Sequence, residues 1–230
     1  MQIAVVNQTT VLADKEIVPK VQAAQTWLFN YVAKFWNASA WLSFVGRDQL
    51  IPPNTWQLLL RDTSDLEGAL GYHDRTVDGL PVGYVFVKTD LESGALWSVT
   101  FSHELGELRI DPWTDLYSQG RVNGQVVFRA YEICDPPEGD EFAIMVNGIP
   151  MSNFVTPRYF QDGAKNGPYD AQGLIKRPGE LLPGGYQNIF SNGKFSDIVA
   201  EHAPNYKPPF PGSRRWLRQI RHERITSNGV

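Results

Sequence analysis

The amino-acid sequence predicts an α+β fold in which two main helices pack on one side of a mixed β-sheet. Three observations lead to this prediction. Residues 14–36 carry apolar side chains at helical spacing, short runs of β-branched and aromatic residues precede and follow them, and a second helical pattern over residues 96–111 ends at Pro112. The apolar content of 42% and the charged content of 20% are ordinary for a globular protein, and 230 residues suffice to bury a substantial core.

The elements are expected in the order strand, long helix, three strands, second helix and further strands. A first strand lies in IAVVNQTTVL, and Asn37 ends the long helix, whose apolar stripe comprises Ile17, Val21, Ala24, Leu28 and Phe35. The segments ASAWLSFVG, TWQLLLRDT and PVGYVFVKTD are predicted to be strands. After the second helix, GQVVFRAYEICDP returns to strand character, and a hairpin is expected around Asn147-Gly148.

The chain is expected to divide into three parts: an α+β domain over residues 1–160, a Pro/Gly-rich arm or lid over residues 161–212, and a basic tail over residues 213–230. Residues 161–212 hold seven of the 16 prolines and eight of the 20 glycines, and they show no periodicity. The tail contains five arginines beside Trp216, Leu217 and Ile220, a composition that favours docking on a protein partner. Contact with nucleic-acid phosphates and a solvated terminal helix are the alternatives for this tail.

Several classes of protein are excluded by composition. The single cysteine, Cys134, excludes an internal disulfide framework and a cysteine-based zinc cluster. The net charge of −4 argues against a general nucleic-acid binder. No apolar run reaches the roughly 18 residues of a membrane span, and the first 16 residues do not have the pattern of a signal peptide. We therefore expect a cytoplasmic or virion-associated chain that binds no membrane and is not a general nucleic-acid binder.

The stretch VTFSHELGELRIDPW carries the candidate chemistry of the protein. On a helix, residues four apart project from one face, so His103 and Glu107 can reach a single metal ion. Imidazole and carboxylate are both zinc ligands, and Glu104, about 100° away around the helix, can take a proton from a water molecule at the ion. The sequence therefore predicts a zinc site with His103 and Glu107 as ligands and Glu104 as general base. The alternative is a buried histidine that is simply paired with Glu107.

A third ligand has to come from elsewhere in the chain. Glu132 is preferred, because a strand packed beside the helix can present it near His103. Asp111 and Asp135 are further candidates, although both stand before a proline, where Asx turns are the more common role of aspartate. His73, in GYHDRTVDG, is expected to be a solvated loop histidine, with the mouth of a cleft as the alternative.

The segment WSVTFSHELGELRIDPW and the later segments YEICDPPEGDEF, GIPMSNFVTPRYF, GPYDAQG and LLPGGY resemble a zincin-like, metallopeptidase-like group of bacterial and phage proteins with an HExxE motif. The likeness covers about residues 70–190. It implies a zincin-like mixed sheet and points to His103, Glu104, Glu107, Asp111, Glu132 and Asp135. It also implies that PVGYVFVKTD is the edge strand that receives an extended peptide substrate.

Two functions from different classes follow from these observations. The first is a zinc-dependent, metallopeptidase-like hydrolase that acts on a peptide or protein substrate. The second is a non-catalytic structural or assembly protein of a phage virion, which keeps a zincin-like fold and contacts its partners through the C-terminal arm. A secreted effector is a third reading, for which the sequence carries no export signal.

Overall fold

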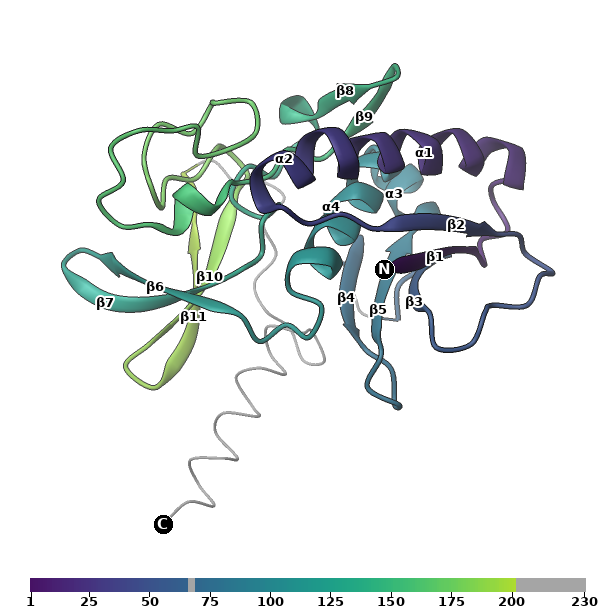
Figure 1. Ribbon diagram of the computed structural model, residues 1–230, viewed down its shortest axis with the longest axis horizontal. Helices are drawn as coiled ribbons and strands as arrows, with labels where there is room; N and C mark the ends of the chain where they lie inside the picture. Colours follow the sequence, from purple (N-terminus) through teal and green to yellow (C-terminus); the bar gives the residue numbers. More distant parts are fainter. Residues whose placement is uncertain (66–68, 202–230) are drawn as a thin grey trace, which may run out of the picture.

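A computed structural model describes residues 1–65 and 69–201 of the chain and has a mixed α+β architecture (Figure 1). The first strands and helices run in the expected order: β1 (Gln2–Asn7), α1 (Asp14–Trp27), the π-helical turn η1 (Leu28–Val32), α2 (Ala33–Trp36), β2 (Trp41–Val45) and β3 (Trp56–Arg61). Then come β4 (Gly71–Arg75), β5 (Pro81–Phe86), α3 (Val87–Ser93) and α4 (Trp97–Ile110). The predicted basic tail, residues 213–230, lies outside the described residues.

The main sheet has the strand order β2-β1-β3-β5-β4. Strands β1, β2, β3 and β5 run parallel to one another, whereas β4 pairs antiparallel with β5 and forms one edge. The segment PVGYVFVKTD was expected to be the edge strand, and this expectation is wrong in two respects. Its strand ends at Phe86, because Val87 already begins α3, and β5 lies inside the sheet between β3 and β4.

The long helix packs on one face of this sheet through the predicted apolar stripe. Ile17, Val21, Ala24 and Leu28 are all buried in the main hydrophobic core, which also takes Ile3 and Val5 from β1. Alternate residues of β1, Ala4 and Val6, belong to a smaller cluster on the opposite face, which contains no helical residue. The helices therefore cover one side of the sheet, as the sequence predicts.

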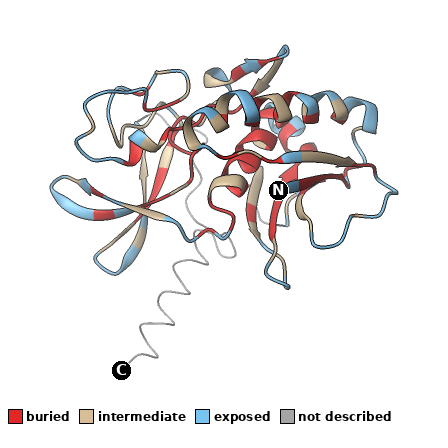
Figure 2. Cartoon of the chain, viewed as in Figure 1, coloured by how far each residue is buried: buried red, intermediate tan, exposed pale blue. Residues whose placement is uncertain are grey.

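Helix α4 lies in the middle of the molecule, between the main sheet and the second half of the chain (Figures 1 and 2). Eleven of its 14 residues are buried, including the polar His103, Glu104 and Glu107. A helix that is buried on most of its circumference needs partners for its polar groups. Residues of β4 and of the loop after β7 lie against α4 and are the partners of these polar groups.

The chain after α4 forms two smaller antiparallel sheets. One has the order β11-β10-β7-β6 and contains β6 (Tyr117–Val122), β7 (Gln125–Ala130), β10 (Tyr186–Ser191) and β11 (Lys194–Val199). The other is the hairpin β8 (Ile144–Val146) and β9 (Ile149–Met151), which confirms the hairpin expected around Asn147-Gly148. The short 3-10 turns η2 (Asp140–Phe142) and η3 (Pro157–Phe160) flank this hairpin.

The Pro/Gly-rich segment is more regular than its composition suggests. Up to residue 201 it contains the hairpin β10–β11, which turns at Asn192-Gly193 and extends the sheet formed by β6 and β7. Among the described residues, no helix combines the length and the apolar character that a bilayer crossing requires.

Candidate metal centre

Helix α4 presents the predicted pair of ligands at the expected spacing. His103 Nε2 lies 3.4 Å from Glu107 Oε1, and these residues are only 9% and 1% exposed. The apolar residues Leu105 and Leu108 of the same helix are fully buried in the core, so they fix the rotation of the helix about its axis. Local helix geometry therefore brings an imidazole and a carboxylate together, as the sequence predicts.

Asp135 supplies the third group. Its Oδ1 lies 3.2 Å from His103 Nε2, and the ligand atoms of His103, Glu107 and Asp135 all lie within 4.8 Å of one another. The loop that carries Asp135 is attached to α4 by a hydrogen bond from the Cys134 backbone N–H to Glu107 Oε1, 3.2 Å long. Gly106 permits this contact, because a Cβ there would lie 3.3 Å from Cys134 Sγ.

The spacing of these three groups fits a bound metal ion. Ligand atoms bound tetrahedrally to zinc at about 2.0–2.2 Å lie about 3.3–3.6 Å from one another. The distances of 3.2 Å and 3.4 Å from His103 Nε2 to the two carboxylates are close to this range. His103 Nε2 carries at most one hydrogen, which can point directly at only one of the two carboxylates. A cation shared by the imidazole and both carboxylates therefore explains the arrangement better than a proton does.

His73 is part of the same centre. The prediction that it is a solvated loop residue is therefore wrong. His73 lies on β4, is fully buried, and its Nδ1 lies 3.6 Å from Glu104 Oε2 and 3.7 Å from Glu107 Oε2. Its partner across the strands is Gly83 on β5. The sequence offered only a weak signal for this residue, namely a histidine in a short run that pairs with the strand PVGYVF.

Glu132 lies in the centre, but not where the sequence predicted it. Strand β7 ends at Ala130, so Glu132 belongs to the following loop and not to a strand. A carboxylate oxygen of Glu132 lies close to ligand atoms of His73 and Glu107. In the group that contains His103 and Glu107, the third residue is Asp135. Glu107 is the member that the two groups share.

Asp111 is the predicted ligand that the structure does not bring to His103. It is fully buried, and its Oδ1 accepts hydrogen bonds from the backbone N–H groups of Asp115 (2.9 Å) and Leu116 (3.2 Å). These hydrogen bonds stabilise a turn, which is the more common role of an aspartate that stands before a proline. Its backbone oxygen lies 3.1 Å from His73 Nε2, so Asp111 acts on the centre by orienting that ring.

Glu104, the predicted general base, lies buried beside His73. It is 6% exposed, and its Oε2 has no hydrogen-bond donor within reach in the described part of the chain. Gly71 on β4 makes room for it, because a Cβ there would lie 2.7 Å from Glu104 Cγ and 2.9 Å from Oε1. A buried carboxylate oxygen that is not engaged in a hydrogen bond can accept a proton from a nearby water molecule.

The electrostatics of the centre favour a bound cation. Burial raises the pKa of Glu107 well above its ordinary value, and the carboxylates of Asp135 and Glu132 raise it further. Burial lowers the pKa of His103, but the negative charge of Glu107 and the hydrogen bond to Asp135 outweigh it and leave the pKa well above 6.5. Burial also raises the pKa of the Cys134 thiol, which therefore stays neutral beside the centre. These shifts arise where carboxylates are crowded together, and a divalent ion relieves that crowding.

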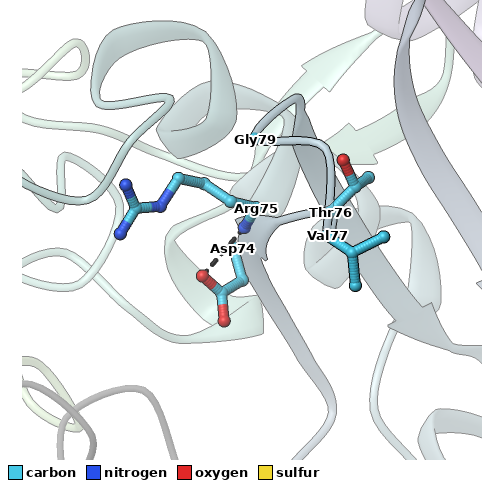
Figure 3. A pocket seen from close by; sticks show the side chains of 5 residues that line it. All are labelled: Asp74, Arg75, Thr76, Val77 and Gly79. Carbon is cyan, nitrogen blue, oxygen red and sulfur yellow. Dashed lines mark hydrogen bonds between the residues drawn. The ribbon is translucent and has the colours of Figure 1, made fainter.

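A separate pocket of about 300 Å³ lies at the turn between β4 and β5, lined by Asp74, Arg75, Thr76, Val77 and Gly79 (Figure 3). Asp74 Oδ1 accepts a hydrogen bond from the Arg75 backbone N–H, and the Arg75 and Val77 side chains extend away from each other. None of the metal-centre residues lines this pocket. The pocket is therefore separate from the candidate site, which is the buried cluster around α4.

Comparison of the chain with protein-family models, with curated protein sequences and with solved structures found no match. The likeness to zincin-like proteins therefore rests on the sequence motifs, and the function has to be argued from the geometry of the centre.

Proposed function

We propose that the protein is a metal-dependent hydrolase in which His103, Glu107 and Asp135 hold a divalent cation and Glu104 is the general base. The observation that carries this proposal is the position of His103 Nε2, which lies 3.4 Å from Glu107 Oε1 and 3.2 Å from Asp135 Oδ1. Zinc suits such a set of imidazole and carboxylate donors, and it would supply a lowered pKa for water at the site.

The residues of the chain divide the remaining tasks between them. Glu104 accepts the proton of the attacking water and returns it to the leaving group. Asp111 holds the His73 ring through its backbone oxygen, and His73 in turn borders the Glu104 carboxylate at 3.6 Å. Because most of the centre is less than a tenth exposed, it excludes bulk water, which strengthens every charge interaction inside it.

The proposed substrate is an extended peptide that lies along β4. This strand is an edge of the main sheet, and it carries both His73 and Gly71, which contact Glu104. An edge strand can bind a peptide through backbone hydrogen bonds, and this would bring the scissile bond near α4.

The decisive experiment combines metal analysis with peptide cleavage by the full-length protein. Glu104→Gln should keep the bound metal and lose turnover by about 10²–10⁴-fold, which is the usual contribution of a general base. His103→Ala and Asp135→Asn should lose both metal and turnover. Glu141→Gln, at an exposed position of the 3-10 turn η2, is the matched control and should change neither.

The metal centre is refuted if the purified protein binds no metal after incubation with zinc, and the role of Glu104 as general base is refuted if Glu104→Gln cleaves peptides as fast as the parent chain. Unchanged turnover with bound metal would leave the metal centre in place and remove only the role of Glu104.

The burial of the centre favours a second candidate, a virion structural or assembly protein that keeps the metal only for stability. The three proposed ligands, His103, Glu107 and Asp135, are at most 9% exposed, as in closed structural sites. In this case chelation would lower the melting temperature, whereas Glu104→Gln would alter neither stability nor assembly.

A further inference from the structure

We propose that the centre takes two divalent cations, with His73, Glu107 and Glu132 as the second ligand set and Glu107 as the bridge. This inference rests on the proposed function, to which it adds a second ion of the first transition row. The ligand atoms of His73, Glu107 and Glu132 lie within 4.8 Å of one another, and all three side chains are at most 3% exposed. Among the described residues, no group of closely spaced ligand atoms contains both His73 and His103. A single ion therefore cannot be bound by both ligand sets.

The orientation of the His73 ring is the first argument. Its Nε2 lies 3.1 Å from the backbone oxygen of Asp111, and because that oxygen can only accept, Nε2 carries the hydrogen. The neutral ring then has its lone pair on Nδ1, the nitrogen that faces Glu104 Oε2 and Glu107 Oε2. A histidine held at one nitrogen by a backbone oxygen, with the other nitrogen directed at anionic ligands, is a common arrangement in metal sites.

The distances at Nδ1 are the second argument. Carboxylate oxygens at 3.6 Å and 3.7 Å are too far for a good hydrogen bond, which spans about 2.7–3.2 Å. They are near the separation of about 3.3–3.6 Å between two ligands of one tetrahedral ion. The gap therefore has the size of an ion and not of a shared proton.

Glu107 is placed to bridge the two positions. Its Oε1 faces His103 Nε2 at 3.4 Å, and its Oε2 faces His73 Nδ1 at 3.7 Å. A carboxylate that binds one ion through each oxygen holds the pair at the separation of about 3.5–4 Å that is typical of two-metal sites.

The charge of the cluster agrees with two ions. Glu104, Glu107, Glu132 and Asp135 are all buried, and once bound cations have displaced their protons they carry four negative charges. Two divalent cations balance these charges, whereas one would leave two of them uncompensated in a region where unpaired charge is costly. Glu104 Oε2, which has no hydrogen-bond donor within reach in the described residues, lies beside the second position.

The test counts the ions bound to the full-length chain and detects whether they interact. The protein is stripped with a chelator, loaded with Mn²⁺, exchanged into metal-free buffer, and analysed by mass spectrometry for metal and by electron paramagnetic resonance. We expect two Mn²⁺ per chain and the spectrum of a spin-coupled pair. His73→Ala and Glu132→Gln should each bind one ion and give the spectrum of isolated Mn²⁺.

Matched controls are available on the same elements. Asp74→Asn alters the residue after His73 on β4, and Glu141→Gln alters an exposed carboxylate in the 3-10 turn η2; both should keep two coupled ions. Circular dichroism checks the fold of each variant, and Glu132→Gln decides the question if His73→Ala does not fold.

The outcomes separate this inference from the proposed function. One Mn²⁺ per chain without spin coupling overturns the second position and leaves the single-metal hydrolase intact. Two ions in His73→Ala and Glu132→Gln also overturn it. A chain that binds no Mn²⁺ or Zn²⁺ overturns the proposed function together with the inference.

Discussion

Replacing Asp90 with asparagine should stabilise the folded protein at alkaline pH and leave its stability nearly unchanged near pH 4. Asp90 lies on α3 and is fully buried, and its Oδ1 accepts a hydrogen bond of 2.8 Å from the Thr100 hydroxyl of α4. Its Oδ2 has no hydrogen-bond donor within reach in the described residues. Asparagine keeps the acceptor for Thr100 and removes the buried charge.

The magnitude follows from the pKa of this carboxyl group. Burial raises the pKa of Asp90 from its ordinary value of 3.8 to about 7, the carboxylates of Asp140 and Glu104 add to the rise, and the Thr100 hydrogen bond opposes it. At about 1.4 kcal/mol for each pKa unit, the difference of about three units between the folded and unfolded chains corresponds to about 4 kcal/mol.

The sign follows from which state holds the proton more tightly. The folded chain does, so the protonated group stabilises the fold fully below pH 4. This stabilisation is lost as the pH rises from about 4 to about 7, and it is absent above pH 7. The variant mimics the protonated group at every pH, so it should exceed the parent chain by up to about 4 kcal/mol at pH 8.5.

The assay is urea unfolding followed by tryptophan fluorescence at pH 4.5 and pH 8.5, with a chelator present. Other groups that titrate are common to both chains and cancel in the difference. Asp48→Asn, at an exposed position, is the control and should match the parent chain at both pH values. A difference between Asp90→Asn and the parent chain that is equal at the two pH values would refute the reasoning.

Three further predictions concern the packing around the centre. Gly71→Ala places a Cβ 2.7 Å from Glu104 Cγ, so peptide cleavage should fall by about 10²-fold, as for a displaced catalytic group, while metal analysis finds the ions retained. Gly106→Ala places a Cβ 2.9 Å from Trp27 Cη2, and thermal melting should show a loss of about 1–3 kcal/mol although alanine favours the helix. A more stable Gly106→Ala chain would contradict this packing. Burial raises the pKa of Cys134 well above 9.0, so a thiol reagent at pH 8 should label it only after urea unfolds the chain. Rapid labelling of the folded chain would contradict its burial.

The sequence was sufficient for features that depend on neighbouring residues. Helical spacing predicts the long helix and α4, and β-branched runs predict β1, β2 and β3, because side chains three or four apart share a helix face and alternate ones share a strand face. The pair His103 and Glu107 is equally local, since one turn of helix sets their separation. The hairpin β10–β11 was also within reach, because Asn192-Gly193 is a turn signal flanked by Phe190 and Phe195.

Only the tertiary structure decided which distant residues complete the centre. His73 comes from the edge strand β4, and Asp135 rather than Glu132 reaches His103, while Asp111 turns its carboxylate toward the backbone. These choices depend on how closely a loop and a strand approach α4, which is governed by contacts between segments far apart in the chain. No spacing rule reports such contacts, because the space left by one missing side chain, as at Gly106, admits a loop from 28 residues further along the chain.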